Sequence, residues 1–277
     1  MAQTDEQARS RREMFGLTGR RAEVVRIEDV TPRYKRIILG GEELEGFKSL
    51  SPSDHFKLLL APDGETEPAI PTFGENGPSI PEGRQRPIMR DYTPRAFDAE
   101  QNLLTIEVAL HTSGVASDWA QQAKVGDVVG TLGPRGSHIL DHTTFDWFVL
   151  AGDETSIPTI ARRLEELPAG KKAFVFIEVD GAEDEQPLTS PADVELTWVH
   201  RNGATAGETD VLVQAIKAFD FPTEGEGFQS YTGEANSLRD IRRYLLKEKG
   251  LDKTWIDFSG HWKYGTADFD HHQPIEE

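Results

Sequence analysis

The 277-residue sequence contains no cysteine and no long apolar run. The absence of cysteine excludes disulfides, thiolate nucleophiles, zinc ribbons and cysteine-ligated iron–sulfur clusters. Any electron carrier must therefore be a bound organic cofactor. No segment approaches the roughly 18 apolar residues of a membrane span, and the first residues lack the apolar centre of a secretory signal. These features predict a cytoplasmic protein with no stable membrane association.

Positive charge is also scarce. The sequence has 30 Lys and Arg against 48 Asp and Glu, which gives a formal net charge of −18. A negative charge of this size repels phosphate backbones and anionic lipids, so nucleic acid is not expected as a partner. An anionic ligand would need a local basic pocket.

The length and the residue patterns predict two domains. Between residues 22 and 140, short β-rich runs alternate with Gly, Pro and Asp turns, which is typical of a small antiparallel β-barrel. Residues 61–87, rich in Pro, Gly and Glu, are expected to form an excursion between barrel strands. Farther on, strands alternate with helices, which predicts α/β architecture with a doubly wound parallel sheet. The expected domains are residues 1–142, with 1–18 as a flexible or helical arm, and residues 143–277, which end in a tail.

The segment Arg90-Asp91-Tyr92-Thr93 resembles the R-x-Y-[ST] flavin motif of ferredoxin-reductase-like flavoenzymes. In a strand, Arg90 and Tyr92 would lie on one face. The fork of an arginine suits a pyrophosphate, because guanidinium and phosphate form paired, charge-assisted hydrogen bonds. The motif implies that Tyr92 packs against the flavin ring or the ribityl chain and that Thr93 hydrogen-bonds the ring edge.

Further segments resemble the siderophore-interacting protein family, in the same order and with similar spacing: HTSGVASDWA from His111, AGDETSIP from Ala151, VHRNG from Val199, TGEA from Thr232 and SGHWKYG from Ser259. The resemblance runs from about Arg21 to Asp268. It implies an FAD-binding barrel followed by a domain for a nicotinamide nucleotide. The implied activity is that of a ferric-siderophore reductase, which passes electrons from NADPH or NADH through FAD to siderophore-bound Fe(III) and releases Fe(II). Since FAD transfers the electrons, no catalytic side chain is expected.

The resemblance assigns cofactor contacts residue by residue. For FAD it adds His111, Gly114, Ala116, Ser117, Thr155 and Trp262 to the three residues of the flavin motif. Gly114 to Ser117 can open a short helix whose free N–H groups face phosphate oxygens. The departure here is Val115, where the family usually has proline. For the nicotinamide cofactor it suggests Arg201, Glu234, Arg239 and Arg242. The arginines favour NADPH through its extra phosphate, whereas the acidic Glu178 argues partly against it.

Three basic residues match positions where the family gathers positive charge beside the flavin. They are Lys57, Arg135 and Lys263, which are expected to bind an anionic ferric siderophore. In the last segment His261 replaces the family's usual tyrosine, and Lys263 replaces an arginine. Lysine offers a point charge where arginine offers a planar fork.

Other functions stay open. A flavin reductase or a reductase of a protein electron carrier would keep the same cofactor sites, and a ferredoxin-like donor is not excluded. A noncatalytic siderophore-binding module would lack electron transfer. The tail residues Asp268, Asp270, His271 and His272 could suggest a metal site. Adjacent histidines point apart in regular structure, so a solvated tail is favoured and no metal is expected.

Overall fold

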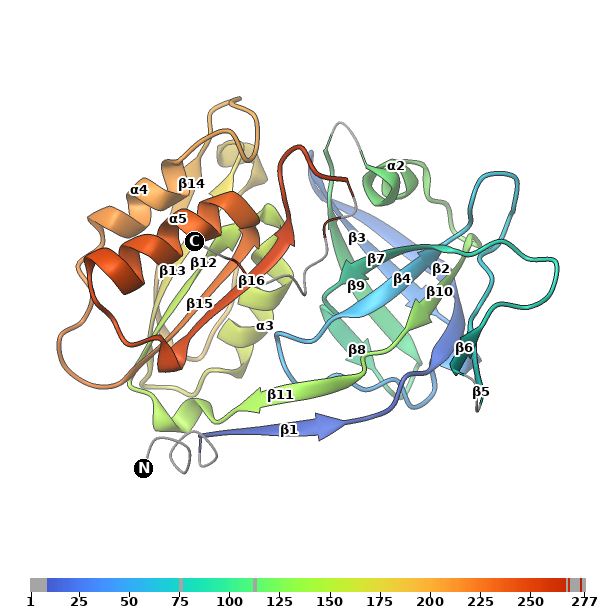
Figure 1. Cartoon of the computed structure of the whole chain (residues 1–277), viewed down its shortest axis with the longest axis horizontal. Helices are drawn as coiled ribbons and strands as arrows, with labels where there is room; N and C mark the ends of the chain where they lie inside the picture. The colour runs from blue at the N-terminus through green and yellow to red at the C-terminus, as the bar shows by residue number, and fades with distance from the viewer. Residues whose placement is uncertain (1–8, 75–76, 112–113, 268, 270–274, 276–277) are drawn as a thin grey trace. The chain divides into compact units, whose positions relative to one another are not determined.

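The structure is a computed structural model, which describes residues 9–74, 77–111, 114–267, 269 and 275 (Figure 1). The chain divides into two compact units, Met1–Leu140 and Asp141–Glu277. This division lies close to the boundary expected after residue 142. The four tail residues considered for a metal site lie outside the described residues.

The first unit is built on a seven-stranded antiparallel sheet. Its strand order is β7 (Ile88–Tyr92), β4 (Phe56–Leu60), β10 (Val128–Leu132), β2 (Gly19–Thr31), β3 (Tyr34–Gly40), β9 (Leu103–Ala109) and β8 (Ala96–Asp98). The two edge strands, β7 and β8, follow one another in the chain and are joined by residues 93–95 alone. Since so short a connection keeps both edges close together, the sheet curls back on itself. The predicted antiparallel barrel is confirmed.

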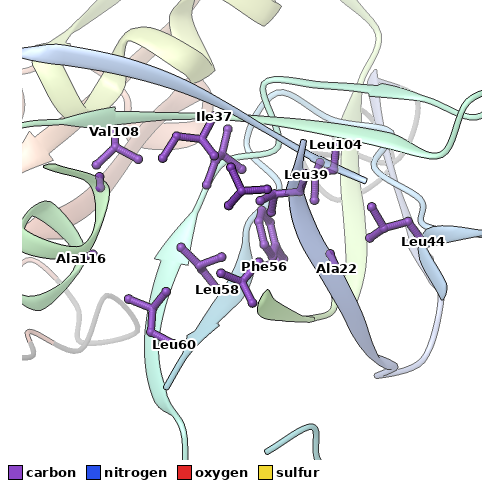
Figure 2. Packing of buried hydrophobic residues seen from close by; sticks show 14 of the residues in the cluster. Ala22, Ile37, Leu39, Leu44, Phe56, Leu58, Leu60, Leu104, Val108 and Ala116 are labelled. Atoms are coloured by element: carbon purple, nitrogen blue, oxygen red, sulfur yellow. The ribbon is translucent and has the colours of Figure 1, made fainter. Parts of the chain in front are cut away.

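The core of this unit comes from side chains that alternate along the strands. Figure 2 shows Ile37 and Leu39 of β3 gathered with Phe56 and Leu58 of β4, and all four are at most 1% exposed. A side-chain period of two sends every second residue into the barrel. Helix α2 (Val115–Gln122) adds Ala116 and Ala120 to the same cluster, and Tyr92 packs against it. Helix α2 and the end of β7 therefore both pack against this core.

A two-stranded ribbon leaves the barrel. Strand β1 (Ser10–Met14) pairs with β11 (Gly136–Leu140) in antiparallel register, with Arg12 opposite His138. The prediction of a flexible or helical arm is wrong for residues 10–14, while residues 1–8 lie outside the described part. The segment SRREM lacks apolar alternation, because this strand has no face in a core.

The predicted excursion at residues 61–87 lies between β4 and β7. It contains a short hairpin of β5 (Thr72–Gly74) and β6 (Gly77–Ser79). The carboxylate of Glu65 accepts a hydrogen bond from Arg84 Nε at 2.7 Å and another from the Gln85 N–H at 2.9 Å. These contacts hold the two ends of the excursion together.

The second unit contains a five-stranded parallel sheet. Its order is β14 (Asp193–His200), β13 (Lys172–Val179), β12 (Trp147–Asp153), β15 (Gly227–Glu234) and β16 (Ile256–Trp262). Helices α4 (Val211–Ala218) and α5 (Ala235–Arg243) pack on one face, and α3 (Ile157–Glu166) lies on the other (Figure 1). The predicted doubly wound sheet is confirmed. Because the strand order reverses between β12 and β15, ligands are expected at the carboxyl ends of these two strands.

None of the helices in the described part of the chain combines the length and the hydropathy needed to cross a membrane.

Candidate functional site

The flavin motif lies on β7, an edge strand of the barrel sheet. Tyr92 stands opposite Phe56 of β4, and Arg90 stands opposite Leu58. Cross-strand partners share a face, so Arg90 and Tyr92 lie together on the face that carries the buried core of β4. Burial raises the pKa of the Tyr92 phenol. Arg90 is half-buried and donates through Nη1 to the Met89 carbonyl at 2.7 Å.

Lys57 lies on the other face of the same strand pair. It stands opposite Asp91, and its Nζ donates to both carboxylate oxygens at 3.0 Å. The structure therefore separates Lys57 from Arg90 and Tyr92. Its charge is already balanced by a carboxylate within the barrel domain.

The start of α2 forms the second part of the flavin site. Gly114 precedes the helix with φ of 143°, and a Cβ there would lie 2.5 Å from Cε1 of His111. Ser117 Oγ accepts from the His111 N–H and donates to the His111 carbonyl, both at 2.9 Å. Its hydroxyl is therefore engaged in holding the loop. Among the described residues no side chain caps the helix, so the N–H groups of its first turn can serve an anion.

These residues suit the pyrophosphate and the flavin–ribityl part of an FAD molecule. A half-buried guanidinium and an uncapped helix start are donors for a pyrophosphate, while Tyr92 offers an aromatic surface for the flavin or the ribityl chain. Thr93 follows Tyr92 directly, and Ala116 is buried in the same cluster. The predicted FAD residues of the barrel domain are thus gathered by β7 and α2.

In the second unit, a buried carboxylate at the end of β12 organises the carboxyl edge of the sheet. Asp153 is 4% exposed, and its Oδ1 accepts from Thr155 N at 2.9 Å and from Thr155 Oγ1 at 2.5 Å. Its Oδ2 accepts from the indole Nε1 of Trp262 at 2.8 Å. Gly233 has φ of 121°, and a Cβ there would come within 2.5 Å of the same Oδ2. Glycine is therefore required where β15 passes this carboxylate.

The threonine extends this arrangement to His261. Thr155 Oγ1 lies 3.1 Å from His261 Nδ1. Since the hydroxyl hydrogen is directed to Asp153, the oxygen accepts from Nδ1–H, which assigns the histidine tautomer. His261 occupies the position at which the family usually has tyrosine.

Glu234 holds the residues that follow β16, the last strand, and also the start of α5. It caps α5 by accepting from Ser237 N at 2.7 Å, and its other oxygen accepts from the Tyr264 N–H at 3.0 Å. The structure thus brings together Thr155, Glu234 and Trp262, three residues predicted from sequence. Their polar groups hold the β12 turn and the last strand in place.

Arg201 was expected to contact a nicotinamide-cofactor phosphate, but it is 8% exposed and enclosed by acids. Its two terminal nitrogens donate to the two oxygens of Glu154 at 2.7 and 2.8 Å, and Nη1 lies 3.4 Å from Glu178. This pairing was not predicted from the sequence, since Glu154 and Arg201 lie 47 residues apart in the chain. The fold creates the pair, because Glu154 and Arg201 each follow directly after a strand of one parallel sheet.

The remaining predicted cations are more open. Arg239 lies on α5 with its side chain 42% exposed and its Nε 4.0 Å from Asp240, and Arg242 lies on the last turn of that helix. Arg135 is exposed, and Lys263 is half-buried. Neither Arg135 nor Lys263 forms a side-chain ion pair with any residue that the structure describes.

Comparison with known proteins decides the family. Residues 23–138 match the model of the siderophore-interacting FAD-binding domain, and residues 145–265 match that of the siderophore-interacting protein. A relative from Escherichia coli, the NADPH-dependent ferric-chelate reductase, is 42% identical over 86% of this chain and 91% of its own length. The chain belongs to the siderophore-interacting protein family.

Two further similar proteins support this assignment. The ferric vibriobactin reductase of Vibrio cholerae is 29% identical over 90% of this chain and 91% of its own. The crystal structure of a siderophore utilization protein from T. fusca is 40% identical, with a TM-score of 0.88 over 95% of this chain and all of its own. The match of the barrel domain to an FAD-binding model identifies FAD as its cofactor.

Replacing Arg90 with alanine is expected to weaken FAD binding about 10- to 150-fold, because a charge-assisted hydrogen bond contributes roughly 1.5 to 3 kcal/mol. The measurement is fluorescence titration of apoprotein with FAD. Arg26→Ala on β2, three strands away in the same sheet, is the control, since its exposed guanidinium pairs with Glu28. Equal FAD affinity in the Arg90 variant and the wild type would remove Arg90 from the site.

Glu178 is expected to make stability depend on pH. Burial raises its pKa from 4.5 to about 7. Between these values the folded chain keeps a proton that the unfolded chain has lost, so the free energy of unfolding falls as pH rises and levels off above about 7. In Glu178→Gln this component is absent. Relative to wild type, the variant should gain roughly 1 to 3 kcal/mol between about pH 4.5 and about pH 8. Urea unfolding at both pH values measures this gain, and parallel pH profiles would contradict the assignment.

Proposed function

We propose that this chain is an FAD-dependent ferric-siderophore reductase that takes electrons from NADH or NADPH. One observation carries the proposal: the chain matches, across both units, relatives that are named for reducing ferric chelates. The arginine, tyrosine and helix start of the barrel domain supply the donor set that FAD requires. The doubly wound domain supplies a sheet edge of the kind that binds a nicotinamide nucleotide.

When bound, FAD would supply the conversion of a two-electron hydride into single-electron transfers, which suits the reduction of Fe(III). The chain's own residues hold and orient the cofactor. Arg90 and the first turn of α2 bind the pyrophosphate, and Tyr92 packs against the flavin or ribityl part. Fe(II) binds hard oxygen donors more weakly than Fe(III) does, so the reduced iron leaves its siderophore. The reduction of Fe(III) is an electron transfer, so it requires no proton transfer from a side chain.

The nicotinamide donor is bound at the carboxyl edge of the second unit's sheet. Arg201 is balanced by Glu154 and Glu178, so a preference for NADPH needs another cation. Arg239 is the candidate, because it is exposed on the helix that starts at this edge. We place the reaction in the cytoplasm, where reduced nicotinamide nucleotides are made.

Anionic ferric siderophore is bound by Arg135 and Lys263, whose charges no carboxylate of the described chain neutralises. Lys57 contributes less, because its ammonium is held by both oxygens of Asp91. In a chain with a net charge of −18, local cations must offset the long-range repulsion of an anion.

The proposal is tested by one anaerobic sequence of additions. FAD-loaded protein is mixed with NADH or NADPH, then with a ferric siderophore in the presence of an Fe(II) chelator. The donor should bleach the flavin absorbance, and the ferric complex should restore it as Fe(II) appears. Flavin that the donor reduces but that does not react with ferric complexes would favour a flavin reductase or a carrier reductase. A protein that cannot be loaded with FAD would favour a noncatalytic siderophore-binding module.

Variants of the three cations refine the test. Lys263→Ala should raise the Michaelis constant for ferric siderophore about three- to fivefold, and more at low salt, while flavin reduction by the donor stays unchanged. The double variant Lys57→Gln/Asp91→Asn is the matched control and should change the constant less than twofold, because it removes both charges of the pair together. Equal effects of the two variants would contradict the role given to the Asp91 pair.

A further inference from the structure

A hollow of about 270 Å³ lies in the barrel unit, away from the flavin motif. Its walls come from the end of β1, the start of β2, the loop after η1 (Glu42–Leu44) and the segment that leads into β11. Its polar side chains include Glu13, Arg20 and Lys48. Neither Arg90, Tyr92 nor any residue of α2 lines it, so the flavin site does not account for it.

Arg20 is the unusual residue of this hollow. Its guanidinium donates to the carbonyls of Gly46 at 3.2 Å and Thr18 at 3.4 Å, and it lies 5.8 Å from the centre of the Phe47 ring. No carboxylate among the described residues pairs with it. Burial lowers its pKa, and no acid opposes that effect. A guanidinium has five N–H donors, of which carbonyls use two here.

Lys48 and Glu13 complete the charge balance of the hollow. They form an ion pair with side chains 46% and 38% exposed, and the Lys48 ammonium lies 4.8 Å from the Phe15 ring centre. Since this pair is neutral, the net charge of the three residues is the single positive charge of Arg20. In a chain with a formal charge of −18, that local excess favours an anion.

The hollow lies next to Arg135, which is proposed above to bind the substrate. The Phe15 N–H donates to the Arg135 carbonyl at 3.0 Å, and Gly133 and Pro134, which precede Arg135, line the wall. Exposed Met14 and the ring of Phe15 add apolar surface next to the cations. The site therefore offers a fork for paired oxygens beside an apolar wall.

We propose that this hollow is an anion subsite, in which Arg20 binds the carboxylate or catecholate oxygens of one arm of the ferric siderophore. The inference rests on the proposed function and adds a binding site to it. Ligand pockets usually measure about 300 to 1,000 Å³, so a hollow slightly below this range suits one arm of a chelator and not the whole complex. Arg135 lies beside the hollow and adds to its positive charge.

The test uses Ga(III) complexes, because Ga(III) has the charge of Fe(III) and is not reduced. Calorimetry of the FAD-loaded full chain measures the dissociation constants of Ga(III) citrate and of Ga(III) tris-catecholate, and so separates carboxylate from catecholate recognition. Arg20→Gln should weaken binding about 5- to 20-fold. Glu13→Gln, which releases Lys48 from its partner, should tighten binding about two- to fivefold. Arg26→Gln, with an exposed guanidinium on the same strand, is the matched control and should change nothing.

Opposite shifts in the Arg20 and Glu13 variants support the subsite, because damage to the fold would shift both in one direction. Unchanged constants in both variants would overturn it, and so would equal weakening in both. Wild-type protein that binds neither complex but still reduces ferric siderophore would overturn the subsite and leave the proposed function standing. Protein that binds the complexes as expected but does not reduce ferric siderophore would support the subsite and overturn the reductase.

Discussion

The buried carboxylate of Asp153 determines how the carboxyl edge of the α/β sheet is arranged. One of its oxygens fixes the turn after β12 through Thr155, and the other holds the indole of the last strand through Trp262. Burying a carboxylate is costly unless it is hydrogen-bonded, and three donors offset part of that cost here, although burial still raises the pKa of Asp153. The glycine at position 233 is dictated by the same oxygen, since any side chain would collide with it. Motifs that lie about a hundred residues apart in the sequence thus belong to one hydrogen-bonded arrangement.

Charge is distributed differently in the two units. The edge of the sheet gathers Asp153, Glu154 and Glu178 around a single guanidinium, that of Arg201. The barrel unit instead keeps Arg20 and Arg135 without carboxylate partners among the residues that the structure describes. An acidic chain can therefore serve an anionic substrate, because local placement of a few cations outweighs a distant net charge at short range. These three acids of the second unit are engaged internally with Arg201.

Features that depend on local sequence were predictable. The common face of Arg90 and Tyr92 follows from the two-residue period of a strand, and the start of α2 follows from the small residues at its first turn. The alternation of strands and helices gave the doubly wound sheet. The ribbon strand β1 was missed because both its faces are largely open, which leaves no apolar period to detect. The pairs Lys57–Asp91 and Arg201–Glu154 were missed because strand register and strand adjacency create them. Their residues are too far apart in the chain for spacing to reveal them.

The organising role of Asp153 is tested most directly by NMR of the Trp262 indole. Its Nε1–H cross-peak, assigned with Trp262→Phe, should be shifted downfield and protected from hydrogen exchange in the wild type. In Asp153→Ala the peak should move upfield and lose protection, while Asp153→Asn, which keeps an acceptor oxygen, should restore part of both. Trp147 gives an internal reference, since its indole donates instead to the Glu224 carbonyl at 3.1 Å. An unchanged, protected Trp262 signal in Asp153→Ala would contradict the account, because the last strand would then be held without this carboxylate.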